Sequence, residues 1–187
     1  MPRKASSLYR KIMDSTTLDV IFITGAPGTG KSTIAKNLQA KLKTPIFEFG
    51  WIPEFQDKGD GHQIGYIEEE TIAFENLVLV IKNYIKHGFK KIIVTDLEDK
   101  RIIQLPQIFE DYKFMIFTLF TEDDRVLKSR VMESTRSSEY RDYQSAIKIN
   151  TSIISRKSLA NEIKIDATIN APDQIVNIIL KSLKDSS

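Results

Sequence analysis

The sequence predicts an α/β fold built on a parallel β-sheet. Short segments rich in β-branched and aromatic residues alternate with segments in which apolar residues recur at helical spacing. The segment Phe114–Phe120 is mostly apolar along its length, as a strand covered on both faces would be. Strands that alternate with helices imply β-α-β units with right-handed crossovers. Sheets of this kind bind ligands at the carboxyl ends of their strands.

The predicted elements follow one another in a regular order. The β-branched and aromatic run Val20–Thr24 predicts a first strand, and apolar residues at helical spacing from Lys31 onward predict a helix after it. Gly88 stands where it would cap the C-terminus of a long helix. The other expected elements are strands at Ile46–Phe49, Ile92–Thr95, Phe114–Phe120 and Ile163–Ile165, a loop at Gly50–Gly65, and helices at Glu68–His87, near Lys100–Glu110, within Glu122–Lys157 and from Pro172 onward.

Length and composition predict one globular domain. We place this domain at residues 18–187, after a basic N-terminal segment at residues 1–17. The formal net charge is +2, so no overall basic character indicates nucleic-acid binding. Cysteine is absent, which excludes disulfides and thiolate metal sites and fits a cytoplasmic location. The longest purely apolar run, Leu77–Ile81, is far shorter than the roughly 20 residues of a membrane-spanning helix.

A glycine-rich loop directly after the first strand is the most specific motif in the sequence. Residues 25–32 read Gly-Ala-Pro-Gly-Thr-Gly-Lys-Ser and match the Walker A pattern. Glycines let successive backbone N–H groups converge on a phosphate, and the following helix points its positive dipole end at the same place. We expect Lys31 to contact the β- and γ-phosphates of a nucleotide, and the Ser32 hydroxyl to ligate Mg²⁺. The residues expected to hold the nucleotide are Gly25, Ala26, Pro27, Gly28, Thr29, Gly30, Lys31, Ser32 and Thr33.

An aspartate that ends the third predicted strand, Asp96, is the second candidate for this chemistry. A carboxylate at that position can hold Mg²⁺ directly or through water, so we expect Asp96 to be both catalytic and a metal ligand. Aspartate is also common at strand ends because it favours turns. Glu98 and Asp99 lie in the same turn and are the alternatives.

Arginines are concentrated after the fourth predicted strand. Arginines that close over phosphates neutralise their charge and help to exclude water. We therefore expect a lid around residues 122–145, with its tip at Ser134–Tyr140, and take Arg130 and Arg136 as catalytic candidates. A solvated helix face is the alternative, because acidic residues are interspersed with the arginines.

The predicted loop after the second strand is both aromatic and acidic. It carries the only tryptophan of the chain, Trp51, together with Glu54 and Asp57. We expect these three residues to bind a small-molecule phosphoryl acceptor, whose hydroxyl Glu54, Asp57 or the preceding Glu48 could orient. The alternative for Trp51 is that it anchors the loop to the core.

The chain resembles the small P-loop kinases from about Leu18 to Leu183, in the loop GAPGTGKST, the strand ending in Asp96, the segment DDRVLKSRVMESTRSSEYRDY and the closing IDATINAPDQIVNIIL. This superfamily includes nucleoside-monophosphate kinases, shikimate and gluconate kinases, adenylylsulfate kinases and antibiotic phosphotransferases. The resemblance implies the P-loop NTPase fold, a three-layer α/β/α sandwich with a five-stranded parallel sheet in the order 2-3-1-4-5. It also implies an acceptor region after the second strand, a lid after the fourth, and an adenine site near Asp166 and residues 170–172.

The predicted activity is an ATP- and Mg²⁺-dependent kinase, a phosphotransferase acting on a small metabolite, nucleoside or nucleotide. ATP is the expected donor because the Asn/Thr-Lys-x-Asp sequence by which GTPases read guanine is absent. Nucleoside-monophosphate kinases usually carry Asp-Gly-x-Pro-Arg after the third strand, whereas residues 96–101 read Asp-Leu-Glu-Asp-Lys-Arg. This departure leaves open an ATP-binding regulatory module without turnover. The basic residues 1–17 leave open a polynucleotide kinase.

Overall fold

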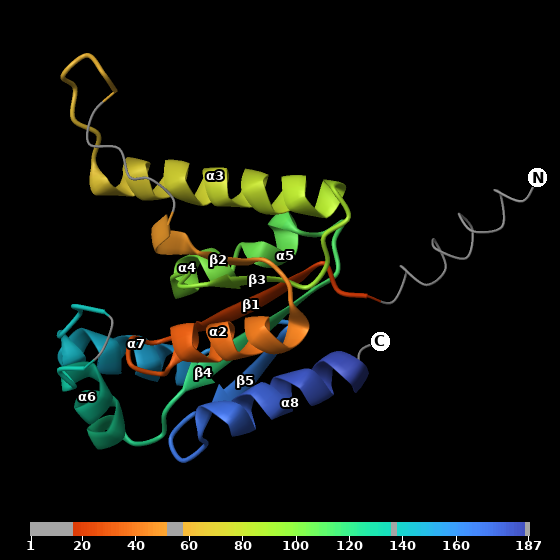
Figure 1. Cartoon of the computed structure of the whole chain (residues 1–187). Helices are drawn as coiled ribbons and strands as arrows, with labels where there is room; N and C mark the ends of the chain where they lie inside the picture. Colours follow the sequence, from red (N-terminus) through yellow and green to blue (C-terminus); the bar gives the residue numbers. More distant parts are fainter. Residues whose placement is uncertain (1–16, 52–57, 136–137, 186–187) are drawn as a thin grey trace, which may run out of the picture.

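The computed structural model describes residues 17–51, 58–135 and 138–185, which form a three-layer α/β/α sandwich (Figure 1). Within this part of the chain, a five-stranded sheet has the order β2-β3-β1-β4-β5, and all neighbouring strands are parallel. The fold class and strand order expected from the sequence are therefore confirmed. The strands are β1 (Val20–Gly25), β2 (Ile46–Glu48), β3 (Ile92–Thr95), β4 (Phe114–Phe120) and β5 (Glu162–Asp166). The helices are α2 (Lys31–Leu42), η1 (Phe49–Trp51, a 3-10 helix), α3 (Tyr66–Lys86), α4 (Asp99–Ile102), α5 (Leu105–Ile108), α6 (Asp124–Met132), α7 (Tyr143–Ser155) and α8 (Pro172–Asp185).

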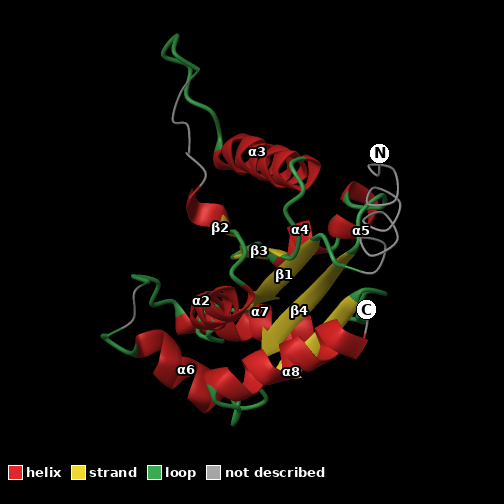
Figure 2. Cartoon of the chain, turned by 45° about the vertical axis from the view of Figure 1, so that its right-hand side comes forward, coloured by secondary structure: helices red, strands yellow, loops and turns green. Residues whose placement is uncertain are grey.

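The central strand β1 sets the layers of the molecule. Val20 is paired with Ile92 of β3 on one side and with Phe114 of β4 on the other. Successive side chains of a strand point to opposite faces of the sheet. Ile21 accordingly packs in a core with α2 and α8, and Phe22 in a second core with α3, α4 and α5. Figure 2 shows the yellow strands enclosed between helices on both sides.

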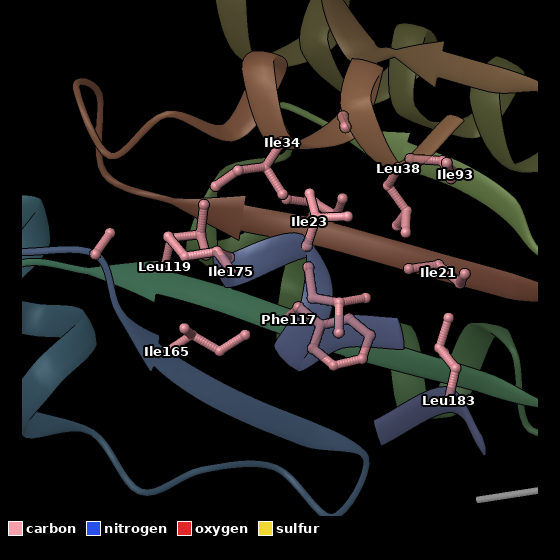
Figure 3. Close-up of a cluster of buried hydrophobic side chains, with 14 of the residues drawn as sticks. Ile21, Ile23, Ile34, Leu38, Ile93, Phe117, Leu119, Ile165, Ile175 and Leu183 are labelled. Atoms are coloured by element: carbon pink, nitrogen blue, oxygen red, sulfur yellow. The ribbon is translucent and has the colours of Figure 1, made fainter. Parts of the chain in front are cut away.

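The core beneath α2 and α8 fixes the position of the helix that begins at Lys31. Ile34 and Leu38 of α2 are spaced one helical turn apart and are buried against the sheet, opposite Phe117 of β4 (Figure 3). Ile175 of α8 completes the same cluster. Burying each of these large side chains contributes roughly 1.5–3 kcal/mol. The N-terminus of α2 is therefore held firmly at the carboxyl end of β1.

The structure differs from the sequence prediction at several element boundaries. The helix expected near Lys100–Glu110 is two four-residue helices, α4 and α5. Pro106 explains the break, because it has no N–H to donate to Ile102 and so cannot continue the first helix. The second strand ends at Glu48 rather than Phe49, and α3 begins two residues before Glu68. Among the described residues, no helix is long and apolar enough to cross a membrane.

Candidate active site

The loop between β1 and α2 is closed by hydrogen bonds to a single carbonyl. The backbone N–H and the hydroxyl of Thr29 both donate to the Ala26 carbonyl oxygen, at 3.2 and 2.8 Å. Gly30 precedes α2 with φ of +91°, a conformation that favours glycine. At Gly25 a Cβ atom would lie 2.3 Å from the Leu119 carbonyl oxygen, so only glycine fits without displacing β4. The motif thus has the backbone conformation that a phosphate-binding loop requires.

The side chains of Lys31 and Asp96 lie close together at the carboxyl edge of the sheet. The Lys31 ammonium lies 3.7 Å from Asp96 Oδ1 and also donates to the Ala26 carbonyl at 3.3 Å. Lys31 is the first residue of α2, and Asp96 directly follows β3 with φ of +70°. The two residues were predicted from separate motifs. Their approach is what parallel strands produce, because the carboxyl ends of β1 and β3 meet at one edge.

Ser32 and Glu48 add two more oxygen groups at this edge. The Ser32 hydroxyl donates to Glu48 Oε1 at 3.4 Å, and Glu48 ends β2, the strand beside β3. Ser32, Glu48 and Asp96 line the same cavity as the glycine loop. Mg²⁺ is usually held by one or two carboxylates together with substrate phosphates. The hydroxyl and two carboxylates present here therefore fit a magnesium ion that arrives with a nucleotide.

The cavity over the loop has a volume of about 750 Å³, within the usual range of small-molecule sites. One part of it is formed by the loop and the start of α2, and another by the segment between β5 and α8. Asn170 and Pro172, expected near the adenine, are among its lining residues. The remaining lining residues outside the loop are Glu48, Asp96, Arg130, Glu133, Thr135, Ser138, Tyr140, Ala167 and Ile175.

The arginine segment forms the two helices α6 and α7, which pack on each other. Arg130 of α6 lines the large cavity and donates to the carbonyl oxygens of Ala167 and Thr168 at 2.8 and 3.2 Å. In this structure Arg130 therefore holds the segment between β5 and α8 by hydrogen bonds to its backbone. Arg136, the other candidate from this segment, lies outside the described residues.

The alternative carboxylates of the β3–α4 turn have other partners. Asp99 accepts three hydrogen bonds from Arg156, at 2.8 to 3.0 Å. Glu98 lies 3.0 Å from the Lys100 ammonium and accepts from the Tyr66 hydroxyl at 3.3 Å. Asp96 is therefore the carboxylate of this turn that the structure places beside Lys31.

Arg101, which stands close to the position of the arginine in nucleoside-monophosphate kinases, is engaged by α3. It donates to both carboxylate oxygens of Glu70, at 2.9 and 2.6 Å, and both side chains are largely buried. The hydrogen bonds from Arg101 hold the pKa of Glu70 below its usual value although burial acts in the opposite direction. Arg101 therefore stabilises the contact between α3 and α4.

Of the three residues predicted to bind the acceptor, the structure describes Trp51. Trp51 ends η1, is 58% exposed and lines neither of the two cavities described here, so it does not anchor the loop to the core. Glu54 and Asp57 lie outside the described residues.

A second cavity, of about 420 Å³, adjoins the first and is lined partly by α7. Sequence reasoning did not single out its α7 residues, Ile149, Ser152 and Ile153. Their spacing of three and four positions is the signal that could have found them, because it places all three on one face of a helix.

Comparison with known proteins identifies the fold. No protein-family model matches the sequence, and no curated protein matches it either. The tunicamycin resistance protein of Deinococcus radiodurans has a similar structure, with a TM-score of 0.65 and 16% identity over 88% of this chain and 94% of that one. A gluconokinase from Sinorhizobium meliloti 1021 gives 0.63 and 13%, covering 89% and 91%. Shikimate kinase from Aquifex aeolicus vf5 gives 0.51 and 17%, covering 88% and 96%.

These similarities extend over nearly the whole of each chain. The protein has the fold of the small P-loop kinases, as the resemblance in its sequence implied. At these low sequence identities the structural similarity shows the fold and does not identify the acceptor.

Proposed function

We propose that the protein is an ATP- and Mg²⁺-dependent kinase that phosphorylates a small molecule. The observation that carries the proposal is the approach of Lys31 to Asp96, 3.7 Å apart, beside a glycine loop that opens into a cavity of nucleotide size. If the loop were only a turn, nothing would require a lysine and an aspartate at these positions. The shared fold with gluconokinase and shikimate kinase supports the same class of reaction.

The chain's own groups would act mainly by position and charge. Lys31 and the loop N–H groups would hold the β- and γ-phosphates of ATP, and the base would lie toward Asn170 and Pro172. Ser32 and Asp96, with Glu48 beside them, would hold Mg²⁺, which when bound neutralises charge on the phosphates. Electrostatic stabilisation of this kind is usually the largest contribution to catalysis.

In the reaction, an acceptor hydroxyl oxygen bonds to the γ-phosphorus while the bond from that phosphorus to the bridging oxygen of ADP breaks. The hydroxyl proton passes to a nearby carboxylate or to water, and a loose transition state does not require a strong base. Residues 122–145 would act as the lid that excludes water, since Ser138 and Tyr140 line the cavity.

The proposal is tested by measuring ADP formation by the full chain with Mg-ATP and a panel of hydroxyl- and phosphate-bearing metabolites. We expect at least one acceptor to raise ADP formation roughly tenfold or more above the rate with ATP alone. An ATP-dependent rise in Tm without any acceptor-stimulated turnover would instead indicate a regulatory module. Phosphorylation of an oligonucleotide, dependent on residues 1–17, would indicate a polynucleotide kinase.

A further inference from the structure

The second cavity lies beside the reacting centre. Its volume is about 420 Å³, and it shares Pro27, Lys31, Asp96 and Tyr140 with the larger cavity. A molecule bound in it would therefore lie next to the phosphates held by the glycine loop. An acceptor must lie next to those phosphates, because phosphoryl transfer needs the two reactants in direct contact.

One wall of the second cavity is apolar and firmly built. Leu97, in the turn after β3, is buried, as is Ile153 of α7, and Ile149 presents a partly exposed side chain one turn earlier. Asn150 fixes α7 to the end of β4, because its side-chain amide both donates to and accepts from the backbone of Thr121, at 2.8 and 3.0 Å. The cavity thus offers a preformed apolar surface rather than a loose gap between helices.

The ionised groups that line this cavity already have opposite charges beside them. Lys100 lies 3.0 Å from Glu98 and 3.3 Å from Glu70, and the hydrogen bond that Lys100 donates to Glu98 is the main reason that the pKa of Lys100 is raised. Lys31 lies beside Asp96 and belongs to the phosphate loop. Asp99, the third carboxylate of the lining, is held by Arg156.

The described lining therefore contains three carboxylates and two ammonium groups, and each ammonium group lies beside a carboxylate. An anionic acceptor would have to leave water for a site that adds no unmatched positive charge, and such a transfer is unfavourable. A neutral hydroxyl compound avoids this cost and gains from the apolar wall.

We propose that this cavity is the acceptor site and that the acceptor is an uncharged alcohol with an apolar face, bound between the Asp96–Lys100 turn and α7. This inference rests on the proposed kinase function and specifies its substrate class. A phosphorylated or carboxylated metabolite is the class that it excludes.

The test uses matched acceptors that differ in charge. ADP formation by the full chain with Mg-ATP is measured with benzyl glucoside against benzyl glucuronide, and with uridine against uridine monophosphate. We expect the neutral member of at least one pair to be preferred by roughly tenfold or more in kcat/KM. Preference for the anionic members would overturn the inference and leave the kinase function standing. An accepted acceptor in the metabolite panel that is anionic, with no turnover of the neutral members of these pairs, would overturn the inference alone. Absence of acceptor-stimulated ADP formation with both the panel and the pairs would overturn both.

A pair of variants on one helix locates the site. Ile149 is 37% exposed and lines the cavity, whereas Ile154 is 45% exposed on the same helix and does not. Ile149→Asp should raise KM for the neutral acceptor roughly tenfold while leaving KM for ATP unchanged, because it places a charge in the apolar wall. Ile154→Asp should change neither constant. Equal effects of the two variants on acceptor KM would contradict the placement.

Discussion

Arg156 and Asp99 are 57 positions apart in the sequence and are joined by three hydrogen bonds of 2.8 to 3.0 Å. The same guanidinium donates to Glu162 Oε2 at 2.6 Å, and the Glu162 side chain is fully buried at the start of β5. Arg156 thus ties the end of α7 both to the turn that carries Asp96 and to an edge strand of the sheet.

Replacing Arg156 with alanine should lower the free energy of unfolding by about 3 kcal/mol or more, because two largely buried carboxylates lose their shared partner. Urea denaturation measures this difference. Arg125→Ala is the matched control, since Arg125 forms its ion pair with Asp123 while 92% exposed and should change stability little. Equal losses of unfolding free energy in the two variants would contradict the claim that the buried ion pairs of Arg156 contribute more to stability than an exposed pair.

The buried carboxylates predict how stability depends on pH. Hydrogen bonds from Arg101 hold the pKa of Glu70 below its ordinary value of 4.5. Burial raises the pKa of Glu162, but the hydrogen bonds from Arg156 and Thr118 outweigh it, and the net shift is also downward. A carboxyl with a lowered pKa in the folded state stabilises the fold above its unfolded value and loses that contribution as pH falls through the folded value.

The free energy of unfolding should therefore fall as pH drops below about 4.5, the ordinary value of these carboxyls. Urea denaturation at a series of pH values measures the slope. Glu70→Gln should make the dependence of the free energy of unfolding on acid pH shallower. Glu69→Gln, which changes the same group one position earlier, should leave that dependence as it is in the unaltered protein. An unchanged slope in the Glu70 variant would contradict the assignment.

The sequence was sufficient to predict the parts of the fold that depend on local pattern. The strand before Gly25, the glycine loop and the helix from Lys31 each have a signal within a few neighbouring residues, and all three lie where expected. The division of residues 122–145 into α6 and α7 also follows from a polar stretch between two helical patterns.

Contacts between residues far apart in the sequence could not be predicted from local patterns. Nothing near Asp99 indicates that Arg156 will bind it, and nothing near Arg101 indicates that Glu70 will. Pairing of this kind depends on how α3, α4 and α7 are placed around the sheet. The apolar wall at Ile149 is hidden for the same reason, because periodicity shows that a helix has an apolar face but not which cavity that face will line.

The glycines of the loop between β1 and α2 should differ in their tolerance of alanine. Gly30→Ala would make only an ordinary van der Waals contact, with Ile34 Cδ1 at 3.9 Å, so positive φ alone should cost about 1–2 kcal/mol. Gly25→Ala also drives a Cβ into the Leu119 carbonyl at 2.3 Å and should cost roughly 3 kcal/mol or more. Urea denaturation compares the two variants.

Gly88→Ala separates backbone strain from a role in the loop. Gly88 has φ of +86° and open space around it, and it follows α3 far from the phosphate loop in the sequence. We expect it to lose about as much stability as Gly30→Ala while keeping full ATP affinity in a binding titration. If both variants weaken ATP binding equally, the result contradicts the assignment of ATP binding to the loop that contains Gly30.

Asp96→Asn should slow phosphoryl transfer roughly 100-fold while leaving the fold intact. Asparagine tolerates the positive φ of +70° found at this position, so the variant removes a charge without adding backbone strain. Transfer rates at saturating ATP across a range of Mg²⁺ concentrations measure the effect. Asp111→Asn, at an exposed turn before β4, is the control and should behave like the unaltered protein. Equal rates for the two variants would remove Asp96 from the site.

The most direct test of the proposed kinase is transfer of the γ-phosphate from labelled ATP to an accepted alcohol by Lys31→Ala. Lys36→Ala, exposed on the same helix, is the matched control. We predict that Lys31→Ala loses roughly 100-fold or more of the transfer rate with an unchanged urea midpoint, while Lys36→Ala keeps both. Transfer at the full rate by folded Lys31→Ala protein would contradict the assignment of this loop as the phosphate site of a kinase.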